Sequence, residues 1–458
     1  MFLSLAGFNK ISGLMNIFKK TFVILPAIIL ILVSCGNRPS ITSHQPVLRT
    51  DTCKKDDNHT YSVYIPSHTS ECELMPLVII IDPHGSGGYA IRHFIEAAES
   101  YKFILGASNL VRNNYSEYTR AIELLIEDMK DQYPIGDEIY LAGFSGGARM
   151  VLSFALDHQL NGVLACGALA QKDHLDAINT SIYALSGRAD FNFPEVADFI
   201  INETDKPSNL KIQLAGELHQ WPSPKDISQA LGWLYLSDMP ADTKCISKSA
   251  ILKDYAATGK KLVDSLLRND QYIQIKMLCH NMLEIKDLPE RHYFKETAES
   301  ADNDPALLAE ISKLRKSLQF EYRIRKAYYN AFGSKDIVWW TREINDLNTR
   351  IEDSKDLTMR FALKRIKAFL GIICYSLTNN ALRTNDLNTA AKTLEIYKLV
   401  EPANPDMFYF FALYYLKTGK ENLIADYIKA ALESGFSDTI QMKKEFPAAV
   451  WKNILPGD

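Results

Sequence analysis

The chain has 458 residues, of which 47% are hydrophobic and 23% are charged, and this composition is typical of a folded globular protein. Its formal net charge of −4 at pH 7 gives no electrostatic basis for binding nucleic acid, so no nucleic-acid partner is expected. A chain of this length predicts two or three domains.

A short apolar segment lies near the start of the chain. Lys19 and Lys20 precede the run Phe22–Val33, which Pro26 interrupts. A basic stretch, a brief apolar run and small residues at its end are typical of a secretory signal peptide. We assign residues 1–35 to this signal, with Met15 as an alternative start. The run is too short to favour a membrane-spanning helix, although an uncleaved anchor is the alternative.

The end of that segment resembles a bacterial lipobox, because Leu32-Val33-Ser34 is followed directly by Cys35. This resemblance implies that Cys35 is lipidated, becomes the mature N-terminus and holds the protein at a membrane surface. Gly36 and Asn37 follow without an acidic cluster. The resemblance therefore implies a place in the bacterial cell envelope, on the periplasmic face of the outer membrane rather than at the cell surface.

Residues 36–60 are interpreted as a linker before the first domain. Cys53 and Cys72 flank the first expected strand and are a candidate disulfide pair in an oxidising compartment. Cys166 occupies the position of a core strand residue. The cysteines show no metal-ligand spacing, so no metal and no other cofactor is expected.

Strand-like and helix-like segments alternate between residues 61 and 240. This alternation predicts an α/β domain with a mostly parallel, doubly wound sheet that carries helices on both faces. After the first expected strand, which lies between Cys53 and Cys72, the expected strands are 77–81, 103–107, 138–142, 162–166, 182–185 and 210–214. The expected helices are 90–100, 115–132, 148–157, 194–202 and 226–236.

A glycine-rich loop follows the most apolar of these strands, Leu77–Ile81, and begins at Asp82-Pro83-His84. Such a loop exposes backbone N–H groups, and esterases use one for part of the oxyanion hole. Gly85 or Ser86 is the expected donor from this loop. The alternatives are a phosphate-cradling turn or a flexible turn, and the absence of a Lys after the glycines argues against a P-loop.

The sequence Gly143-Phe144-Ser145-Gly146-Gly147 has the pattern G-x-S-x-G between an expected strand and an expected helix. Strand, sharp turn and helix form the setting of a nucleophile elbow, in which the serine lies on a strained turn. Ser145 is therefore the candidate nucleophile. Gly146 at the helix start is the candidate second N–H donor to an oxyanion. The alternative is a glycine-rich turn without chemistry.

Two further polar side chains follow the ends of expected strands. Asp190 comes after 182–185, and His219 comes after 210–214. Because open α/β sheets bind ligands at the carboxyl edge, both side chains are expected to meet Ser145 there, Asp190 as the acid and His219 as the base. His84 and His93 are the alternative bases, and Asp198 and Glu195 are the alternative acids.

These motifs together resemble those of the α/β-hydrolase superfamily. The likeness covers Tyr61 to Leu236 and is greatest to dienelactone hydrolases and to esterases of the polyhydroxybutyrate-depolymerase-like or feruloyl-esterase-like kind. It rests on His84-Gly85, Gly143–Gly147, Gly187–Asp190 and His219–Pro222. The resemblance implies a serine esterase that acts on small or carbohydrate-linked acyl esters.

Two positions are candidate substrate contacts. Trp221 belongs to the H-x-W-P segment, and Asn109 belongs to the polar connection 108–115 at the edge where the catalytic groups are expected. The alternative for 108–115 is a solvated loop. Within the enzyme class a serine peptidase is the second candidate, because the same triad serves amides. Outside that class the alternative is a non-catalytic scaffold with a relic hydrolase domain.

Helical patterns replace strand patterns after residue 240. We expect a helical domain over 241–380, with helices at 246–268, 272–282, 305–332, 335–352 and 357–378, followed by paired helices over 381–458. The last part resembles tetratricopeptide repeats, with the expected aromatic, small and turn positions at Phe408, Phe411, Ala412, Tyr415, Gly419 and Ala431, and Ala390 in the preceding unit. The resemblance implies a surface for a protein partner, and a generic helical hairpin is the alternative. The helical half is expected to be dispensable for hydrolysing a small ester.

Overall fold

The structure, a computed structural model, describes residues 45–67, 74–237, 248–436 and 439–451, all within one compact unit that spans Pro39–Asp458. The predicted signal peptide, Cys35 and Cys72 lie outside the described residues. Of the helices that the structure describes, none combines the length and apolar character that crossing a membrane requires.

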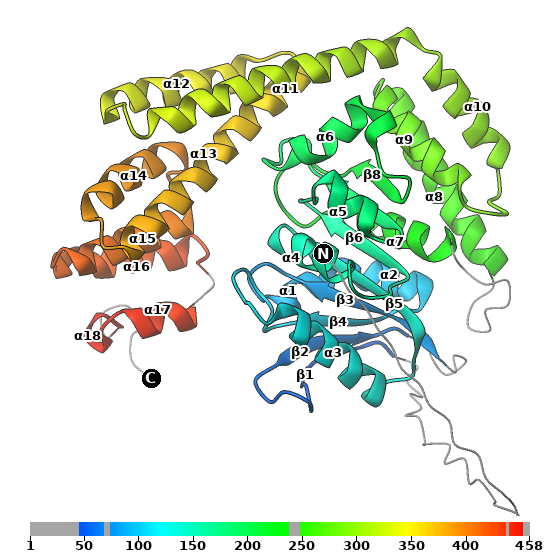
Figure 1. Cartoon of the computed structure of the whole chain (residues 1–458), viewed down its shortest axis with the longest axis horizontal. Coiled ribbons are helices and arrows are strands. Elements are labelled where there is room, and N and C mark those ends of the chain that lie inside the picture. The colour runs from blue at the N-terminus through cyan, green and yellow to red at the C-terminus, as the bar shows by residue number, and fades with distance from the viewer. Residues whose placement is uncertain (1–44, 68–73, 238–247, 437–438, 452–458) are drawn as a thin grey trace, which may run out of the picture. The chain divides into compact units, whose positions relative to one another are not determined.

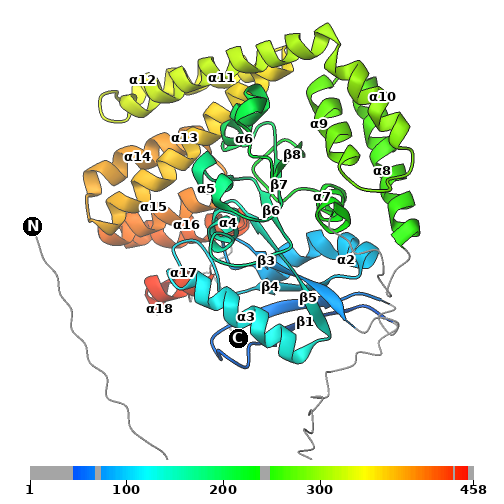
Figure 2. The same ribbon diagram turned by 45° about the vertical axis from the view of Figure 1, so that its right-hand side comes forward.

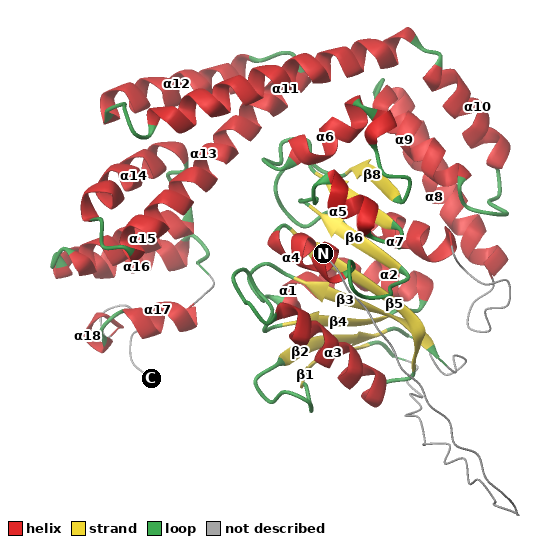
Figure 3. Cartoon of the chain, viewed as in Figure 1, coloured by secondary structure: helices red, strands yellow, loops and turns green. Residues whose placement is uncertain are grey.

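An eight-stranded sheet forms the first half of the chain, in the order β1-β2-β4-β3-β5-β6-β7-β8 (Figures 1 and 3). β1 pairs antiparallel with β2 and β2 antiparallel with β4, whereas the other neighbours are parallel. The strands are β1 (Val47–Thr52), β2 (Thr60–Ile65), β3 (Met75–Ile81), β4 (Ile104–Ser108), β5 (Ile135–Phe144), β6 (Gly162–Cys166), β7 (Ile182–Ser186) and β8 (Leu210–Leu214). The predicted α/β class, with an all-helical region after the sheet, is confirmed.

Helices cover both faces of the sheet, which explains why its central strands are continuously apolar. All of β3 is buried. Its alternate side chains enter different cores, with Ile80 in one and Ile79 in the other. The Ile80 core contains α2 (Ile95–Tyr101) and α7 (Pro224–Ser237). The Ile79 core contains α3 (Tyr118–Gln132), α4 (Gly146–Phe154) and α6 (Phe193–Ile201).

The strand β1 lies in the segment that the sequence predicts to be a linker. Its side chains are exposed or half-buried, and Arg49 and Asp51 interrupt any apolar alternation. Charged residues are common on edge strands, because they prevent pairing with other chains. The sheet therefore begins before residue 61. This edge strand was not predicted because it lacks the apolar alternation by which strands are recognised.

The second half of the described chain is helical (Figure 2). Its helices are α8 (Lys248–Arg268), α9 (Tyr272–Leu283), α10 (Arg291–Asp302), α11 (Pro305–Ala331), α12 (Ile337–Asp353), α13 (Leu357–Arg383), α14 (Leu387–Val400), α15 (Pro405–Lys417), α16 (Glu421–Glu433), α17 (Thr439–Glu445) and α18 (Ala448–Trp451). The short elements of the first half are α1 (Gly87–Ala90), α5 (Lys172–Ala177), η2 (Ile91–Phe94) and η3 (Glu203–Asp205). The helix α10 lies where the sequence pattern predicted no helix.

The apolar core continues across residue 240. Tyr255 of α8 and Met282 of α9 belong to the same buried cluster as Trp233 of α7. Leu314 of α11 shares the other cluster with Val196 of α6. The first helices after the sheet therefore complete its two cores, and a separate helical core begins further along α11.

The pair α15 and α16 forms a helical hairpin at the position where the repeat-like pattern was found. Gly419 takes a φ of 71° in the turn between them, a left-handed conformation that favours glycine. Ala412 and Ala431 are fully buried, and Ile424, which stands where such repeats usually have a small residue, is 1% exposed. The assignment of this hairpin to the tetratricopeptide family stays a prediction.

Candidate active site

Ser145 lies at the turn between β5 and α4. Its φ of 53° and ψ of −115° belong to a region that residues with side chains rarely occupy. The turn is tight, because a Cβ added to Gly147 would lie 2.2 Å from the backbone oxygen of Ile81. A Cβ at Gly143 would lie 2.4 Å from the backbone of Gly147. These glycines allow the chain to reverse sharply, so the geometry is that of a nucleophile elbow.

Asp190 lies in the turn after β7 and is 1% exposed. Its Oδ1 accepts a hydrogen bond from the backbone N–H of Asn192 at 2.8 Å, and the Asn192 side chain donates to the oxygen of Gly167 at 2.8 Å. Gly167, with a φ of 66°, leaves room for the acid, since a Cβ there would lie 3.2 Å from Asp190 Oδ2. The carboxylate is therefore held with Oδ2 as its remaining acceptor.

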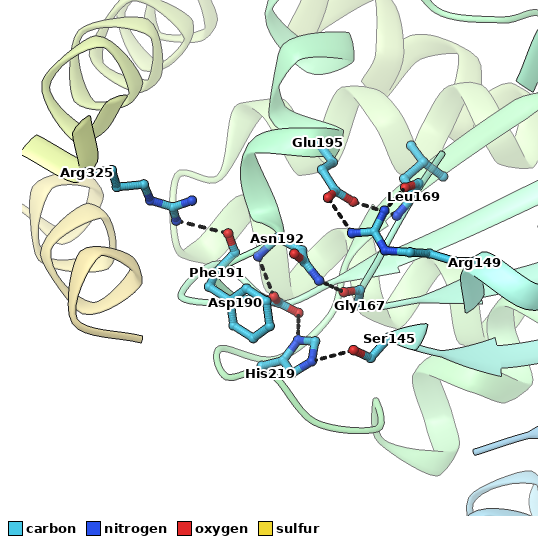
Figure 4. Close-up of polar contacts among 10 residues, drawn as sticks. All are labelled: Ser145, Arg149, Gly167, Leu169, Asp190, Phe191, Asn192, Glu195, His219 and Arg325. Atoms are coloured by element: carbon cyan, nitrogen blue, oxygen red, sulfur yellow. Dashed lines mark hydrogen bonds and ion pairs between the residues drawn. The ribbon is translucent and has the colours of Figure 1, made fainter. Parts of the chain in front are cut away.

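His219 lies in the loop after β8 and joins the other two side chains (Figure 4). Its Nδ1 is 2.8 Å from Asp190 Oδ2, and its Nε2 is 2.9 Å from Ser145 Oγ. With Nδ1 protonated, the imidazole donates to the carboxylate and accepts the serine hydroxyl proton. The rings of Phe144 and Phe191 pack on the imidazole at centroid distances of 4.7 and 4.2 Å. The structure thus brings Ser145, His219 and Asp190 into one hydrogen-bonded chain.

The alternative acids have other partners. Glu195 forms an ion pair with Arg149 at 2.6 Å and accepts from the N–H of Leu169 at 2.8 Å (Figure 4). Asp198 accepts from the hydroxyl of Tyr322 at 3.2 Å. Neither carboxylate contacts His219, and Asp190 is the acid that does.

The alternative bases lie away from the serine hydroxyl as well. His93 stacks on Trp221 at a centroid distance of 6.1 Å. His84 is on the glycine-rich loop, where its Nδ1 lies 3.6 Å from Asp82 Oδ1 and its side chain is 73% exposed. Its interaction with Asp82 raises the pKa of His84, and the charge of Asp406 on α15 adds to the rise. His84 therefore pairs with Asp82 on the glycine-rich loop and is not the base of this site.

Asp82 organises the glycine-rich loop and was not singled out from the sequence. Its Oδ1 accepts from the backbone N–H of His84 at 2.9 Å and of Ser86 at 3.3 Å, and its backbone oxygen accepts from Gly85 at 3.1 Å. Burial raises the pKa of Asp82, but hydrogen bonds from His84 and Trp221 outweigh it and hold that pKa below its usual value. The two expected loop donors, Gly85 and Ser86, therefore donate within the loop in this structure. The position of Asp82 directly after a central strand could have indicated its role from the sequence.

Trp221 was expected to contact substrate, and the structure corrects this. The side chain is 5% exposed, and its Nε1 donates to Asp82 Oδ2 at 2.9 Å. It also packs edge-on against Phe94 at 5.5 Å. Trp221 therefore supports the glycine-rich loop from inside the core.

Asn109 was the second expected substrate contact, and it too lies behind the loop. Its Nδ2 donates to Thr60 Oγ1 at 3.4 Å, and its Oδ1 would lie 2.7 Å from a Cβ at Gly87. From the same connection, Asn113 is the residue that reaches the elbow, because its Oδ1 would lie 1.8 Å from a Cβ at Gly146. The connection 108–115 therefore lies against the glycine-rich loop and the elbow, and a contact between Asn109 and substrate stays a prediction.

The described cysteines Cys53 and Cys166 lie in the core rather than among the catalytic side chains. Cys53 is a buried free thiol whose Sγ lies 3.8 Å from the oxygen of Leu124, and its proposed disulfide partner Cys72 lies outside the described residues. Cys166 is fully buried in β6. Within the part of the chain that the structure describes, no group of His, Cys, Asp and Glu side chains is arranged to hold a metal ion.

No family model matches the chain, and no curated protein matches it. Among solved structures it is similar to Est1E from Butyrivibrio proteoclasticus, at 14% identity over 38% of this chain and 90% of that one, with a TM-score of 0.30. It is also similar to dienelactone hydrolase from Anabaena variabilis, at 16% identity over 42% and 98% of the two chains, with a TM-score of 0.31. A dienelactone hydrolase-like promiscuous phosphotriesterase from metagenomic libraries shares 12% identity over 48% and 96%, with a TM-score of 0.31. These likenesses are too distant to carry an argument about function.

Proposed function

We propose that this protein is a serine hydrolase that cleaves carboxylic esters through Ser145, His219 and Asp190. The observation that supports it is the continuous chain of hydrogen bonds from Ser145 Oγ to His219 Nε2 and from His219 Nδ1 to Asp190 Oδ2, with the serine on a strained elbow. A strained, positive-φ serine bonded to a histidine is costly to maintain without a purpose. Nucleophile, base and orienting acid are the three roles that acyl transfer requires.

In the proposed mechanism Ser145 Oγ attacks the ester carbonyl while His219 Nε2 takes the hydroxyl proton. Asp190 keeps the Nδ1–H of His219 in place and stabilises the imidazolium. The proton then passes from His219 to the leaving alcohol. Water attacks the acyl-enzyme by the same route in reverse and releases the carboxylic acid.

The developing oxyanion is proposed to bind at the start of α4. The N–H groups of the first helical turn have no intrahelical partner and carry the positive end of the helix dipole, so Gly146 is the first donor. Ser86 is the proposed second donor, because its N–H bond to Asp82 is long at 3.3 Å. Catalytic hydrogen bonds often tighten only when substrate is bound.

A substrate panel tests the proposed reaction. Short p-nitrophenyl esters, acetylated and feruloylated sugars and peptide anilides would be compared with the wild type and with Ser145→Ala. We expect turnover of esters by the wild type and none by the variant. Turnover of anilides alone would favour a serine peptidase. No turnover by folded protein would favour the scaffold alternative, in which the helical region carries the function.

We further propose that the protein is lipid-anchored in the bacterial cell envelope through Cys35, facing the periplasm from the outer membrane. The support is the basic and apolar leader that ends at Cys35. A fatty-acid analogue supplied during growth should label the wild type but not Cys35→Ala. Equal labelling of both proteins would place the lipid elsewhere. A protein partner for the repeat-like helices stays a prediction.

A further inference from the structure

Two helices from the second half of the chain contact the turn that carries Asp190. Arg325 of α11 donates from Nη2 to the backbone oxygen of Phe191 at 2.9 Å (Figure 4). Arg365 of α13 donates from Nη1 to the backbone oxygen of Arg188 at 2.6 Å. The two carbonyls lie on opposite sides of Asp190 in the chain, so the turn is held at both ends by helices distant in sequence.

The two arginines share one buried carboxylate. Glu321 of α11 is 0% exposed, and its Oε2 accepts from Arg365 Nε at 2.8 Å and from Nη2 at 2.6 Å. Its Oε1 lies 2.5 Å from Arg325 Nη2. Both guanidinium groups contact this one carboxylate, and both also donate to backbone carbonyls of the Asp190 turn. Because a buried charge is unfavourable without polar partners, the carbonyls of the Asp190 turn are needed by this cluster.

Aromatic rings complete the contact between the turn and the helices. The guanidinium of Arg365 lies 4.5 Å from the ring centre of Phe193, directly after the turn. Conversely, the turn contributes an arginine, because the guanidinium of Arg188 lies 4.9 Å from the ring centre of Phe361 on α13. The Asp190 turn and α13 therefore each place an arginine against a ring of the other, and these contacts restrict the turn more than a single hydrogen bond would.

The same helices reach the His219 loop. The N–H of Ala189 donates to the oxygen of Glu217 at 2.6 Å, so the acid turn and the histidine loop are joined. The Glu217 side chain forms an exposed ion pair with Lys364 at 3.2 Å. Lys364 and Arg365 are neighbours on α13, and each contacts one of the two loops that carry the proposed acid and base. The helix α13 therefore contacts both the turn that carries Asp190 and the loop that carries His219.

We propose that Arg325 and Arg365 are positioning residues, which hold Asp190 in register with His219 and make the helical half part of the catalytic unit. This inference rests on the proposed function of the Ser145 site. It replaces the expectation that the helical half is dispensable for a small ester. Apolar side chains would fill the same space without the desolvation penalty of buried charges. The charged cluster is therefore explained by the position in which it holds the Asp190 turn.

Arg325→Met is the sharpest perturbation, because it removes the bond to Phe191 but leaves Glu321 and Arg365 as a neutral pair. The matched control is Lys367→Met on α13, which also removes one cation but whose Nζ donates to Asn348 Oδ1 at 2.7 Å. Both variants and the wild type would be labelled with a fluorophosphonate, and the rate and the final extent of labelling would be measured separately. Turnover of a short ester and the thermal midpoint would be recorded on the same samples.

We expect Arg325→Met to slow labelling and lower kcat by about 10- to 100-fold, because small misplacements of catalytic groups have effects of that size. The final extent of labelling and KM should stay close to those of the wild type. A residue with a purely structural role would instead reduce the labelled fraction without slowing the labelling of each folded molecule. Lys367→Met should match the wild type in both rate and extent.

Arg325→Lys serves as the second variant, since it keeps the charge and a single donor nitrogen but not the planar fork. Its labelling rate should lie between those of the wild type and Arg325→Met, about 3- to 10-fold below the wild type. If Arg325→Met does not fold, this variant decides the question. Labelling of folded variants at the wild-type rate would overturn the inference and leave the proposed function intact. Failure to label the wild type would overturn the proposed function and the inference with it.

Discussion

Replacing Asp190 with Asn tests how the acid acts on His219. Asp190 Oδ1 accepts from the N–H of Asn192 at 2.8 Å, which requires an acceptor at that position. An asparagine would therefore keep its oxygen there and turn its NH₂ group toward His219 Nδ1, 2.8 Å away. Nδ1 would then have to accept the hydrogen bond, and the ring proton would move to Nε2. In this tautomer Nε2 cannot take the proton of Ser145.

The expected loss is about 10⁴-fold in kcat, or about 5.5 kcal/mol of transition-state stabilisation, as for the wrong tautomer in other triads. KM should change little, because Asp190 is 1% exposed and does not face substrate. The thermal midpoint should stay near that of the wild type, since the substitution conserves volume and the bond to Asn192. The loss should thus be confined to the chemical step.

The assay is steady-state hydrolysis of a short p-nitrophenyl ester, with circular dichroism to verify folding. Asp198→Asn is the matched control, because Asp198 bonds to Tyr322 and not to His219. It should keep activity within about twofold, as is usual for a surface substitution. If Asp190→Asn retained more than a tenth of the wild-type kcat, or if Asp198→Asn lost as much, the assignment of Asp190 would be refuted.

Three further substitutions probe the surroundings of the triad. Ser145→Gly should raise the free energy of unfolding, measured by urea denaturation, by about 1 kcal/mol, because relief of backbone strain exceeds the entropic penalty of glycine. A free energy of unfolding below that of the wild type would mean that the elbow is not strained. Gly147→Ala should lower that free energy by about 3 kcal/mol, since its Cβ would lie 2.2 Å from the backbone oxygen of Ile81, and an unchanged thermal midpoint would contradict this. Trp221→Phe should lower it by about 1–3 kcal/mol at neutral pH, because Asp82 Oδ2 loses its donor. Because the folded-state pKa of Asp82 is lowered, the difference in free energy of unfolding between Trp221→Phe and the wild type should be full above pH about 4 and should vanish as the pH falls through the folded-state pKa of Asp82. A difference that does not depend on pH would exclude Asp82 as its cause.

The parts of the fold that local sequence determines were predicted well. β3 was found because a strand buried on both faces is continuously apolar, and the elbow was found because only glycines fit around Ser145. Asp190 and His219 were selected because they follow strand ends. In each case the physical requirement falls on neighbouring residues, so it leaves a pattern in the sequence.

Other features depend on contacts between distant segments and leave no such pattern. β1 was missed because an exposed edge strand has no apolar alternation. Trp221 was taken for a substrate contact because its partner, Asp82, is 139 residues away. The bond from Arg365 to Arg188 spans 177 residues. Glu321 and Arg325 have the i, i+4 spacing of a helical ion pair, but Arg365 is 44 residues away from Glu321, so its part in the cluster could be found only in three dimensions.

Fluorophosphonate labelling of the purified protein, followed by peptide mapping of the adduct, shows whether Ser145 is an activated nucleophile. We expect one adduct, on Ser145, and its complete loss in Ser145→Ala, which should remain folded and also lose ester turnover. An unlabelled but folded wild type, an adduct on a different serine, or ester turnover retained by Ser145→Ala would contradict this expectation.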